Sequence, residues 1–273
     1  MALIPSFFMD CVVAIGAGHE NNISWFASGF LYGEYLRVEK DESVYNVFLA
    51  TNNHVFKDFS SVYLRFNPQG NESAKNFLLR LVGRDDNRLW FAHPNEEIDV
   101  AITQINLDLL KKYNIRYSFF HSDIDVAPID KMNELGIAEG DSTYTLGFPL
   151  GIVGEQRNVV VVRSGSIARI KDVLAKTNIK YLVDTFIFPG NSGGPVISRP
   201  ELISIVGTKS QDKAYLIGIV SSYLTYRDEA ISTQTKQTRV IFEENSGLAT
   251  VFPVDYVEET IKEYYKTISI KRD

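Results

Sequence analysis

Short hydrophobic segments bounded by polar turns dominate the chain. Residues 62–66 (VYLRF) alternate apolar and polar side chains, which is the pattern of a strand with one buried face. Further runs rich in β-branched and aromatic residues occupy 77–83, 158–170, 181–188 and 214–224. Turn-forming clusters such as NPQGNES and GRDDN separate these runs. Many short strands with regular turn signals favour an all-β fold, built as barrels or as a sandwich, over alternating βαβ units.

Two segments have helical patterns. Residues 107–115 (LDLLKKYNI) form a short candidate, and residues 255–268 form a stronger one. Within the second segment Val257, Ile261 and Ile268 fall on one apolar stripe, with acidic residues near its start and lysines later. We expect this helix to pack across the preceding barrel. The alternative, a membrane-surface helix, fits less well because the polar face is mixed in charge rather than basic.

The chain divides near residues 120–135, where polarity rises, which predicts one unit over 1–125 and a second over 126–273. Residues 10–16 read as a first core strand, with Cys11 as a small buried apolar residue. The stretch 225–247 is long and polar, and we expect a mobile hairpin or loop there, a usual place for binding or regulation.

Composition narrows the function classes. The 273 residues carry 28 Lys and Arg against 34 Asp and Glu, a net charge of −6, which argues against a general binder of nucleic acid or anionic membranes. A single cysteine excludes an internal disulfide and a multi-cysteine metal site, and we expect no metal or cofactor. No apolar run approaches the ~20 residues of a membrane span. The start lacks a positive charge and Asp10 interrupts it, so we expect a cytoplasmic protein without a secretory signal.

The segment FPGNSGGPV (188–196) is the most informative stretch. Gly190, Gly193 and Gly194 flank Ser192 with residues that tolerate strained turns. Such a turn can expose the serine hydroxyl and aim backbone N–H groups at one point, which are the nucleophile and the oxyanion donors that acyl transfer needs. The alternative is a simple glycine-rich turn. The segment also fits the nucleophile elbow of α/β-hydrolases, but all four histidines precede Ser192, and that fold needs its histidine afterwards.

A histidine and a carboxylate complete the candidate site. His54 follows directly after an apolar strand at 43–50, where it can project from a barrel rim into a cleft. Asp99 stands at the head of the apolar stretch IDVAI, where a carboxylate is expected to be buried and to need a partner such as an imidazole N–H. The alternatives are an ordinary histidine and a strand-capping aspartate. We expect His93, which precedes a proline, to lie exposed in a loop.

Three segments together carry a family resemblance. TNNHV around His54, DVA at Asp99 and PGNSGGPV around Ser192 resemble the catalytic motifs of the chymotrypsin-like serine proteases, most closely the HtrA-type trypsin-like peptidase domain. The chain order and the separations of 45 and 93 residues match those of the chymotrypsin triad. Weaker agreement comes from the pieces SGF (28–30) and GIVS (218–221). The resemblance covers nearly the whole chain.

The resemblance implies a fold and a mechanism. It implies two six-stranded antiparallel β-barrels, the first carrying the histidine and aspartate and the second carrying the serine, followed by the C-terminal helix. Ser192 would be the nucleophile, His54 the general base and Asp99 its orienting acid. Backbone N–H groups of Gly190 and Ser192 would form the oxyanion hole.

The resemblance also implies substrate-binding residues. Ser221 matches the family serine that hydrogen-bonds the catalytic aspartate, and the strand at 219–223, which includes Ser222, would pair with an extended substrate. Phe186 and Tyr223 match the base and wall of the first specificity pocket. Because no carboxylate lies there, cleavage after small or medium apolar residues is expected. The alternative is that both aromatic side chains face the core.

Departures from the family leave other functions open. Asn191 replaces the aspartate that pairs with a freed amino terminus in secreted trypsins, and no Ile-Val-Gly-Gly start is present, so activation by cleavage is not expected. Nor do we expect a PDZ domain. The expected function is a serine endopeptidase acting on protein or peptide substrates. The alternatives are a catalytically silent peptide-binding module and a protease gated by a regulatory partner or by homo-oligomerisation, with 225–247 as the latch.

Overall fold

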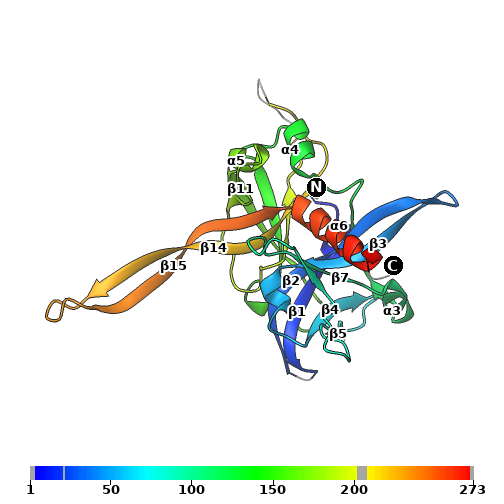
Figure 1. Cartoon of the computed structure of the whole chain (residues 1–273), viewed down its shortest axis with the longest axis horizontal. Helices are drawn as coiled ribbons and strands as arrows, with labels where there is room; N and C mark the ends of the chain where they lie inside the picture. The colour runs from blue at the N-terminus through cyan, green and yellow to red at the C-terminus, as the bar shows by residue number, and fades with distance from the viewer. Residues whose placement is uncertain (1–3, 21, 202–207, 271–273) are drawn as a thin grey trace.

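The computed structural model describes residues 4–20, 22–201 and 208–270 and is built mainly of β-strands (Figure 1). Nine strands form the first sheet, in the hydrogen-bonded order β5-β4-β1-β2-β3-β7-β6, with β8 beside β4 and β9 beside β2. They are β1 (Val12–His19), β2 (Asn22–Glu39), β3 (Glu42–Thr51), β4 (Ser61–Pro68), β5 (Lys75–Arg80), β6 (Phe91–Ala92), β7 (Ala101–Gln104), β8 (Ile115–Arg116) and β9 (Phe120–His121). Three of the nine strands have only two residues. Among the described residues β5 does not pair with β6, so this sheet differs from the closed six-stranded barrel expected for the first unit.

Six strands from the second half close into an antiparallel barrel, in the order β10-β11-β12-β15-β14-β13. They are β10 (Ser142–Gly147), β11 (Val161–Arg169), β12 (Tyr181–Asp184), β13 (Pro195–Ser198), β14 (Leu216–Ile231) and β15 (Thr238–Pro253). Along β12 the buried Tyr181 and Val183 alternate with less buried neighbours, which is the period of two that a strand requires. The predicted all-β class and this six-stranded barrel are confirmed.

The helices are short except for the last. They are α1 (Phe7–Asp10), α2 (Asn53–Phe56), α3 (Leu107–Lys112), α4 (Ile129–Leu135), the 3-10 turn η1 (Pro149–Gly151), α5 (Lys171–Leu174) and α6 (Asp255–Ile270). The predicted helix at 107–115 stops at Lys112, because Asn114 adopts a positive φ of 53° and the chain then enters β8. Among the described residues, no helix is both long enough and apolar enough to cross a bilayer.

Helix α6 confirms the predicted helix at 255–268, but its packing differs from the expectation. Its apolar face lies against the first sheet rather than across the barrel that precedes it. The Tyr264 ring centroid lies 5.8 Å from that of Phe48, and the Tyr32 hydroxyl donates to Glu258 at 3.0 Å. The helix therefore joins the barrel to the first sheet.

A buried cluster at the junction of the two halves positions the site. It combines Val12 and Phe30 of the first sheet with Leu146, Phe148 and Ile219 of the barrel region, all at most 4% exposed. The first core strand begins at Val12 rather than at residue 10. Cys11 precedes it and is fully buried, as predicted, and burial raises the pKa of its thiol.

The stretch 225–247 is a hairpin rather than a loop. Strands β14 and β15 stay paired from Thr225 opposite Asn245 to Ile231 opposite Thr238, and this two-stranded ribbon extends away from the barrel (Figure 1). A second hairpin, formed by β2 and β3, extends from the opposite side of the molecule.

Candidate active site

His54 and Asp99 form the best-defined polar pair of the site. The Nδ1 atom of the imidazole lies 2.6 Å from Oδ2 of the carboxylate, and the backbone N–H of His54 donates to Oδ1 at 3.0 Å. The amide of Asn52 also donates to the backbone carbonyl of Asp99 at 2.7 Å. The side chains are 43% and 24% exposed, so the predicted burial of the aspartate is only partial.

Strand pairing explains why these two residues meet. Strands β3 and β7 are antiparallel neighbours, with Thr51 opposite Ala101. His54 lies in α2 just after β3, and Asp99 lies just before β7, so both leave the same edge of the sheet. A histidine after one strand and an aspartate before its antiparallel neighbour must lie close together.

The loop that carries Ser192 is fixed by backbone hydrogen bonds. It connects β12 to β13 at the junction between the halves. The N–H of Gly193 donates to the Val220 carbonyl, and the Val220 N–H donates to the Gly194 carbonyl, both at 2.9 Å. The Ser192 carbonyl accepts from the Ser28 N–H at 2.9 Å. The loop is therefore held by both the barrel and the first sheet.

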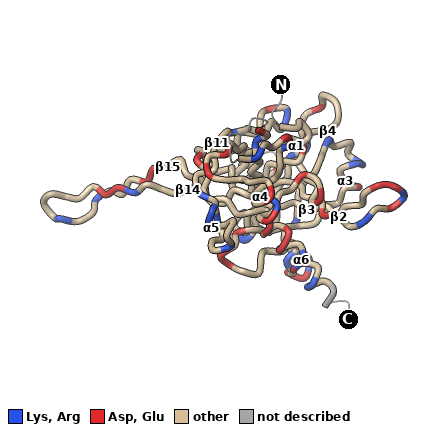
Figure 2. The backbone as a smooth tube through the Cα atoms, turned by 90° about the horizontal axis from the view of Figure 1, so that it is seen from above, with Lys and Arg blue, Asp and Glu red and all other residues tan. Residues whose placement is uncertain are grey.

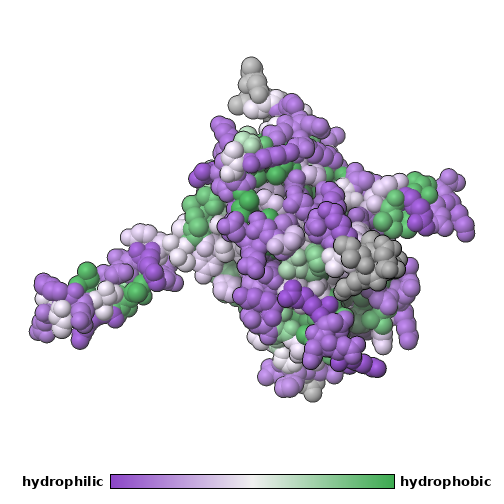
Figure 3. Space-filling view, viewed as in Figure 1, coloured by the Kyte–Doolittle hydropathy of each residue, from purple (hydrophilic) through white to green (hydrophobic). Residues whose placement is uncertain are grey.

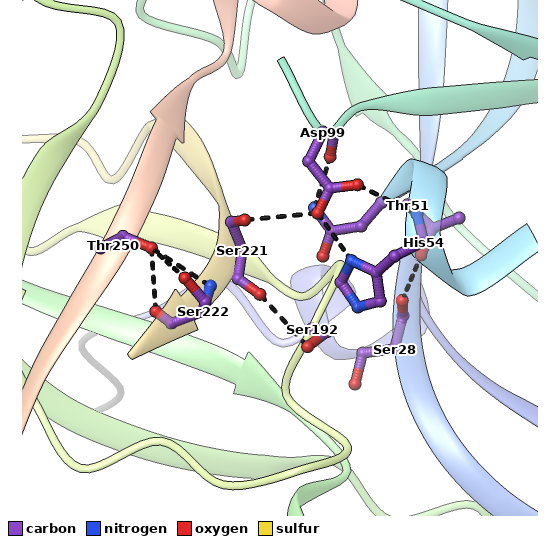
Figure 4. Close-up of polar contacts among 9 residues, drawn as sticks. Ser28, Thr51, His54, Asp99, Ser192, Ser221, Ser222 and Thr250 are labelled. Carbon is purple, nitrogen blue, oxygen red and sulfur yellow. Dashed lines mark hydrogen bonds and ion pairs between the residues drawn. The ribbon is translucent and has the colours of Figure 1, made fainter. Parts of the chain in front are cut away.

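Ser221 connects the serine loop to the His54–Asp99 pair. Its hydroxyl donates to Asp99 Oδ2 at 3.3 Å, and its carbonyl accepts the Ser192 hydroxyl at 3.3 Å. Figure 4 shows the second ring nitrogen of His54 on the side of Ser192. No hydrogen bond between His54 and Ser192 occurs in the described structure; the serine hydroxyl points to Ser221 instead. The side chains of His54, Asp99 and Ser192 therefore belong to one polar network, in which Ser221 contacts both Asp99 and Ser192.

The backbone turn at Gly190 requires a glycine. Gly190 adopts a φ of 104°, and a Cβ atom added there would collide with the Phe148 carbonyl. The Pro189 carbonyl accepts from the Leu150 N–H at 2.6 Å. Since the carbonyl and N–H of one trans peptide point in opposite directions, this bond turns the Gly190 N–H away from Leu150. Within the described ranges, neither this N–H nor that of Ser192 donates to another protein atom.

Asn191 has a structural place in the same turn. Its side-chain oxygen accepts from the Phe188 N–H at 3.0 Å, and its backbone N–H donates to the Phe188 carbonyl at 2.9 Å. The residue is fully buried. An amide in place of the family aspartate therefore closes the turn without placing a charge there.

The predicted pocket residues lie at the base of the β14–β15 ribbon. Phe186 is 52% exposed, so it does not face the core. A Cβ atom on Gly247 would lie 3.5 Å from its ring. Tyr223 is half-buried and packs against the barrel core, as the alternative expected. The Ser222 hydroxyl lies 2.7 Å from that of Thr250, so it is tied to β15.

Ser28 is the residue that sequence reasoning missed. Its buried hydroxyl donates to the Gly190 carbonyl at 2.6 Å and accepts from the Phe148 N–H at 3.0 Å. Thr51 in turn donates to the Ser28 carbonyl at 2.8 Å. The weak motif SGF at 28–30 was the available signal. These contacts fix the Gly190 turn from the first sheet.

The other histidines lie in different surroundings. His93, expected in an exposed loop, has a side chain only 7% exposed, 3.3 Å from Glu259 of α6. That expectation is wrong because α6 covers this edge of the sheet. His121 forms a further histidine–carboxylate pair, with Asp125 at 2.6 Å. The described residues hold no cluster of three or more histidine, cysteine or acidic side chains suited to a metal ion.

Comparisons with known proteins give one family match and a structural match. The sequence model of a family described as the trypsin-like peptidase domain matches residues 27–205, a range that includes His54, Asp99 and Ser192. Among solved structures, the apo form of the MamO protease domain from Magnetospirillum magneticum is 13% identical, with 92% of this chain and 96% of that chain covered and a TM-score of 0.48. The comparison with curated proteins finds no match.

Proposed function

The chain belongs to the family of trypsin-like peptidase domains, and from this premise we propose that it is a serine endopeptidase. The observation that carries the proposal is the 2.6 Å contact of His54 Nδ1 with Asp99, joined through Ser221 to the Ser192 loop. A carboxylate on Nδ1 holds the imidazole with Nε2 free to accept a proton. That nitrogen is the one on the side of Ser192 (Figure 4).

The proposed reaction proceeds in two steps. His54 Nε2 takes the proton of the Ser192 hydroxyl while Oγ bonds to the substrate carbonyl carbon. The carbonyl oxygen becomes an oxyanion that the N–H groups of Gly190 and Ser192 stabilise, an effect on the order of 10²–10³ in rate for each donor. The scissile C–N bond then breaks, and His54 returns the proton to the leaving amine. Water, deprotonated by His54, hydrolyses the acyl-enzyme and restores the hydroxyl.

Substrate binding would release the serine for this reaction. The Ser192 hydroxyl donates to the Ser221 carbonyl, with the long distance of 3.3 Å. A peptide strand that pairs with residues 221–223 would compete for backbone acceptors of that edge. The hydroxyl is then free to turn to His54.

For specificity we propose cleavage after small or medium apolar residues. The exposed Phe186 ring over Gly247 gives the pocket an apolar lining. The stretch FIFP that begins at Phe186 contains no carboxylate that would attract a basic side chain. A panel of peptides that differ only in the residue before the cut tests this. Faster cleavage after Val or Ala than after Arg is expected, and the reverse order would contradict it.

The orientation of Ser192 favours a second candidate function, a peptidase gated by a partner. If the hydroxyl rests on Ser221 until a regulator binds, basal activity is low and rises when the partner or a second copy is added. A catalytically silent peptide-binding module is the further alternative. The HtrA-type affiliation and the cytoplasmic location stay predictions.

The direct test is hydrolysis of an unfolded protein substrate, followed by mass spectrometry of the products. The wild-type chain is expected to cut the substrate, and the Ser192→Ala variant is expected to leave it intact while keeping the same thermal unfolding curve. Equal cleavage by both chains would contradict the proposal. Absence of cleavage by the wild type at every protein concentration would favour the binding module.

A further inference from the structure

The outer part of the β14–β15 hairpin exposes an unusual run of apolar residues. We call residues 225–231 and 238–245 the distal ribbon; Figures 1 and 2 show that it stands clear of the rest of the molecule. Its consecutive Val240, Ile241 and Phe242 are 48%, 46% and 53% exposed. Apolar residues appear on the ribbon surface in Figure 3. Three adjacent exposed apolar residues are unfavourable for a soluble surface unless they serve a function.

The same run lies on an open strand edge. Strand β15 pairs with β12 only from Leu248 to Val251. From Thr238 to Glu244 its edge away from β14 has no partner strand in the described part of the chain. An edge strand with free N–H and C=O groups is a template for pairing with another chain.

The charges around the apolar run match each other in an antiparallel pairing. The run is flanked by Arg239 on one side and Glu243 on the other. Two identical antiparallel strands are related by a two-fold axis perpendicular to the sheet. The axis therefore lies at one residue, which faces its own copy in the other strand, and not between two residues. With the axis at Ile241, Arg239 of each copy lies opposite Glu243 of the other, and Val240 lies opposite Phe242.

Neighbouring choices of partner edge and register match less well. An axis at Phe242 would set Ile241 against Glu243, and an axis at Val240 would set Arg239 against Ile241. On the edge of β14 an axis at Asp228 would set Arg227 against Glu229, but it would also set the two copies of Asp228 against each other, which is unfavourable. Arg239 makes no ion pair among the described residues, whereas Glu243 already lies 3.1 Å from Arg227 of β14.

We propose that the distal ribbon is a homodimerisation element, in which β15 of two copies pair in antiparallel orientation about Ile241. The two ribbons then form one four-stranded sheet with the order β14-β15-β15-β14. The two Arg239–Glu243 pairs fix the register, and the apolar residues of both copies cover one another on each face.

This arrangement keeps both candidate active sites open. The serine loop contacts β14 on the edge away from β15, through Val220. Pairing through β15 therefore leaves the edge at residues 221–223 free for substrate. The inference concerns a surface outside the catalytic residues, so it stands or fails independently of the proposed peptidase activity.

The test is the association state of the full chain, measured by sedimentation velocity over a dilution series. The wild type is expected to dimerise reversibly. In the Arg239→Glu variant both cross-strand pairs would join two glutamates, and in the Glu243→Arg variant both would join two arginines. Each variant is expected to weaken the affinity of the dimer on the order of 10- to 100-fold. An equimolar mixture of the two variants restores both opposite-charge pairs, so a heterodimer of near wild-type affinity is expected.

The mixture distinguishes charge repulsion in the paired strands from distortion of the ribbon, because a variant that merely distorts the ribbon is not rescued by a second distorted variant. Lys236→Glu, a charge reversal in the turn of the same hairpin, is the matched control and is expected to leave dimerisation unchanged. A wild-type chain that stays monomeric at every concentration would overturn the proposal and assign the ribbon to a different partner. Failure of the mixture to associate would overturn the Ile241-centred register.

Discussion

Asp99 holds His54 at two points. Its Oδ2 lies 2.6 Å from the ring Nδ1, and its Oδ1 accepts the backbone N–H of the same histidine at 3.0 Å. One carboxylate thus fixes both the ring and the start of the short helix that carries it. Neither contact involves Ser192.

This double contact makes Asp99→Asn the informative change at the pair. An amide can present either an oxygen or an NH₂ group toward Nδ1, so it no longer enforces the tautomer that leaves Nε2 as the base. We expect a fall in kcat of about 10⁴. Steady-state kinetics measure it, and Asp125→Asn, at the His121–Asp125 pair, is the matched control that keeps its activity. An equal loss in both variants would contradict the assignment.

The hydroxyl of Ser221 orients Asp99 from the barrel side, at 3.3 Å. Ser221→Ala removes this bond and keeps the carbonyl that accepts from Ser192. A smaller effect than at Asp99 is expected, roughly tenfold in kcat/KM, because one hydrogen bond to a charged group is worth about 1.5 kcal/mol. Ser222→Ala, next along the strand, is the variant for comparison, because it breaks a contact with Thr250 rather than with the aspartate. Identical kinetics for wild type and Ser221→Ala would refute the positioning role.

The turn at Gly190 tests the oxyanion hole. Gly190→Ala meets both a φ of 104° and a collision with the Phe148 carbonyl, so the peptide must rotate and its N–H leaves the site. Loss of one donor lowers kcat on the order of 10²–10³. Gly70→Ala is the control, since Gly70 also has a positive φ of 75° but nothing within 4 Å of an added Cβ. Kinetics and thermal unfolding of both variants distinguish a lost donor from general strain.

Asp125 links stability to pH. Burial acts to raise the pKa of this carboxyl, but hydrogen bonds from His121 and the nearby Lys213 ammonium outweigh it and hold the pKa below its usual value. A lowered pKa contributes stability above the unfolded pKa of about 3.9, and this contribution is lost as the pH falls through the folded value. Asp125→Asn is expected to lower the free energy of unfolding by about 1–3 kcal/mol near neutral pH.

The same variant should differ little from the wild type in strong acid. Urea unfolding at a series of pH values gives both curves, and they should converge once the pH falls below the lowered pKa of folded Asp125, because the wild-type carboxyl is then neutral like the amide. A constant difference across this range would show that the aspartate acts by shape rather than by charge.

Local patterns predicted much of this architecture. Alternation at 62–66 corresponds to β4, because a period of two is a property of the strand itself. The β-branched and aromatic runs at 181–188 and 214–224 overlap β12 and β14. The apolar stripe of 255–268 likewise gave α6. The stripe could not predict the surface against which α6 packs, because the contact of Tyr264 with Phe48 depends on how the two halves of the chain meet.

The residues of the candidate site were likewise predictable only in part. His54, Asp99 and Ser192 stand in motifs whose residue types and order predicted the candidate site. Ser28 stands only in the weak motif SGF; its contact with the Gly190 turn, 162 residues away in the chain, depends on the approach of β2 to that turn. The same holds for His93, whose burial depends on α6.

Reaction of the purified chain with a fluorophosphonate tests the central claim most directly. If His54 activates Ser192, the hydroxyl oxygen bonds to phosphorus, fluoride leaves, and peptide mapping by mass spectrometry finds the adduct on Ser192. Labelling is expected to vanish in Ser192→Ala and to slow strongly in His54→Ala. An unlabelled wild-type chain, or a labelling rate unchanged by His54→Ala, would contradict the account.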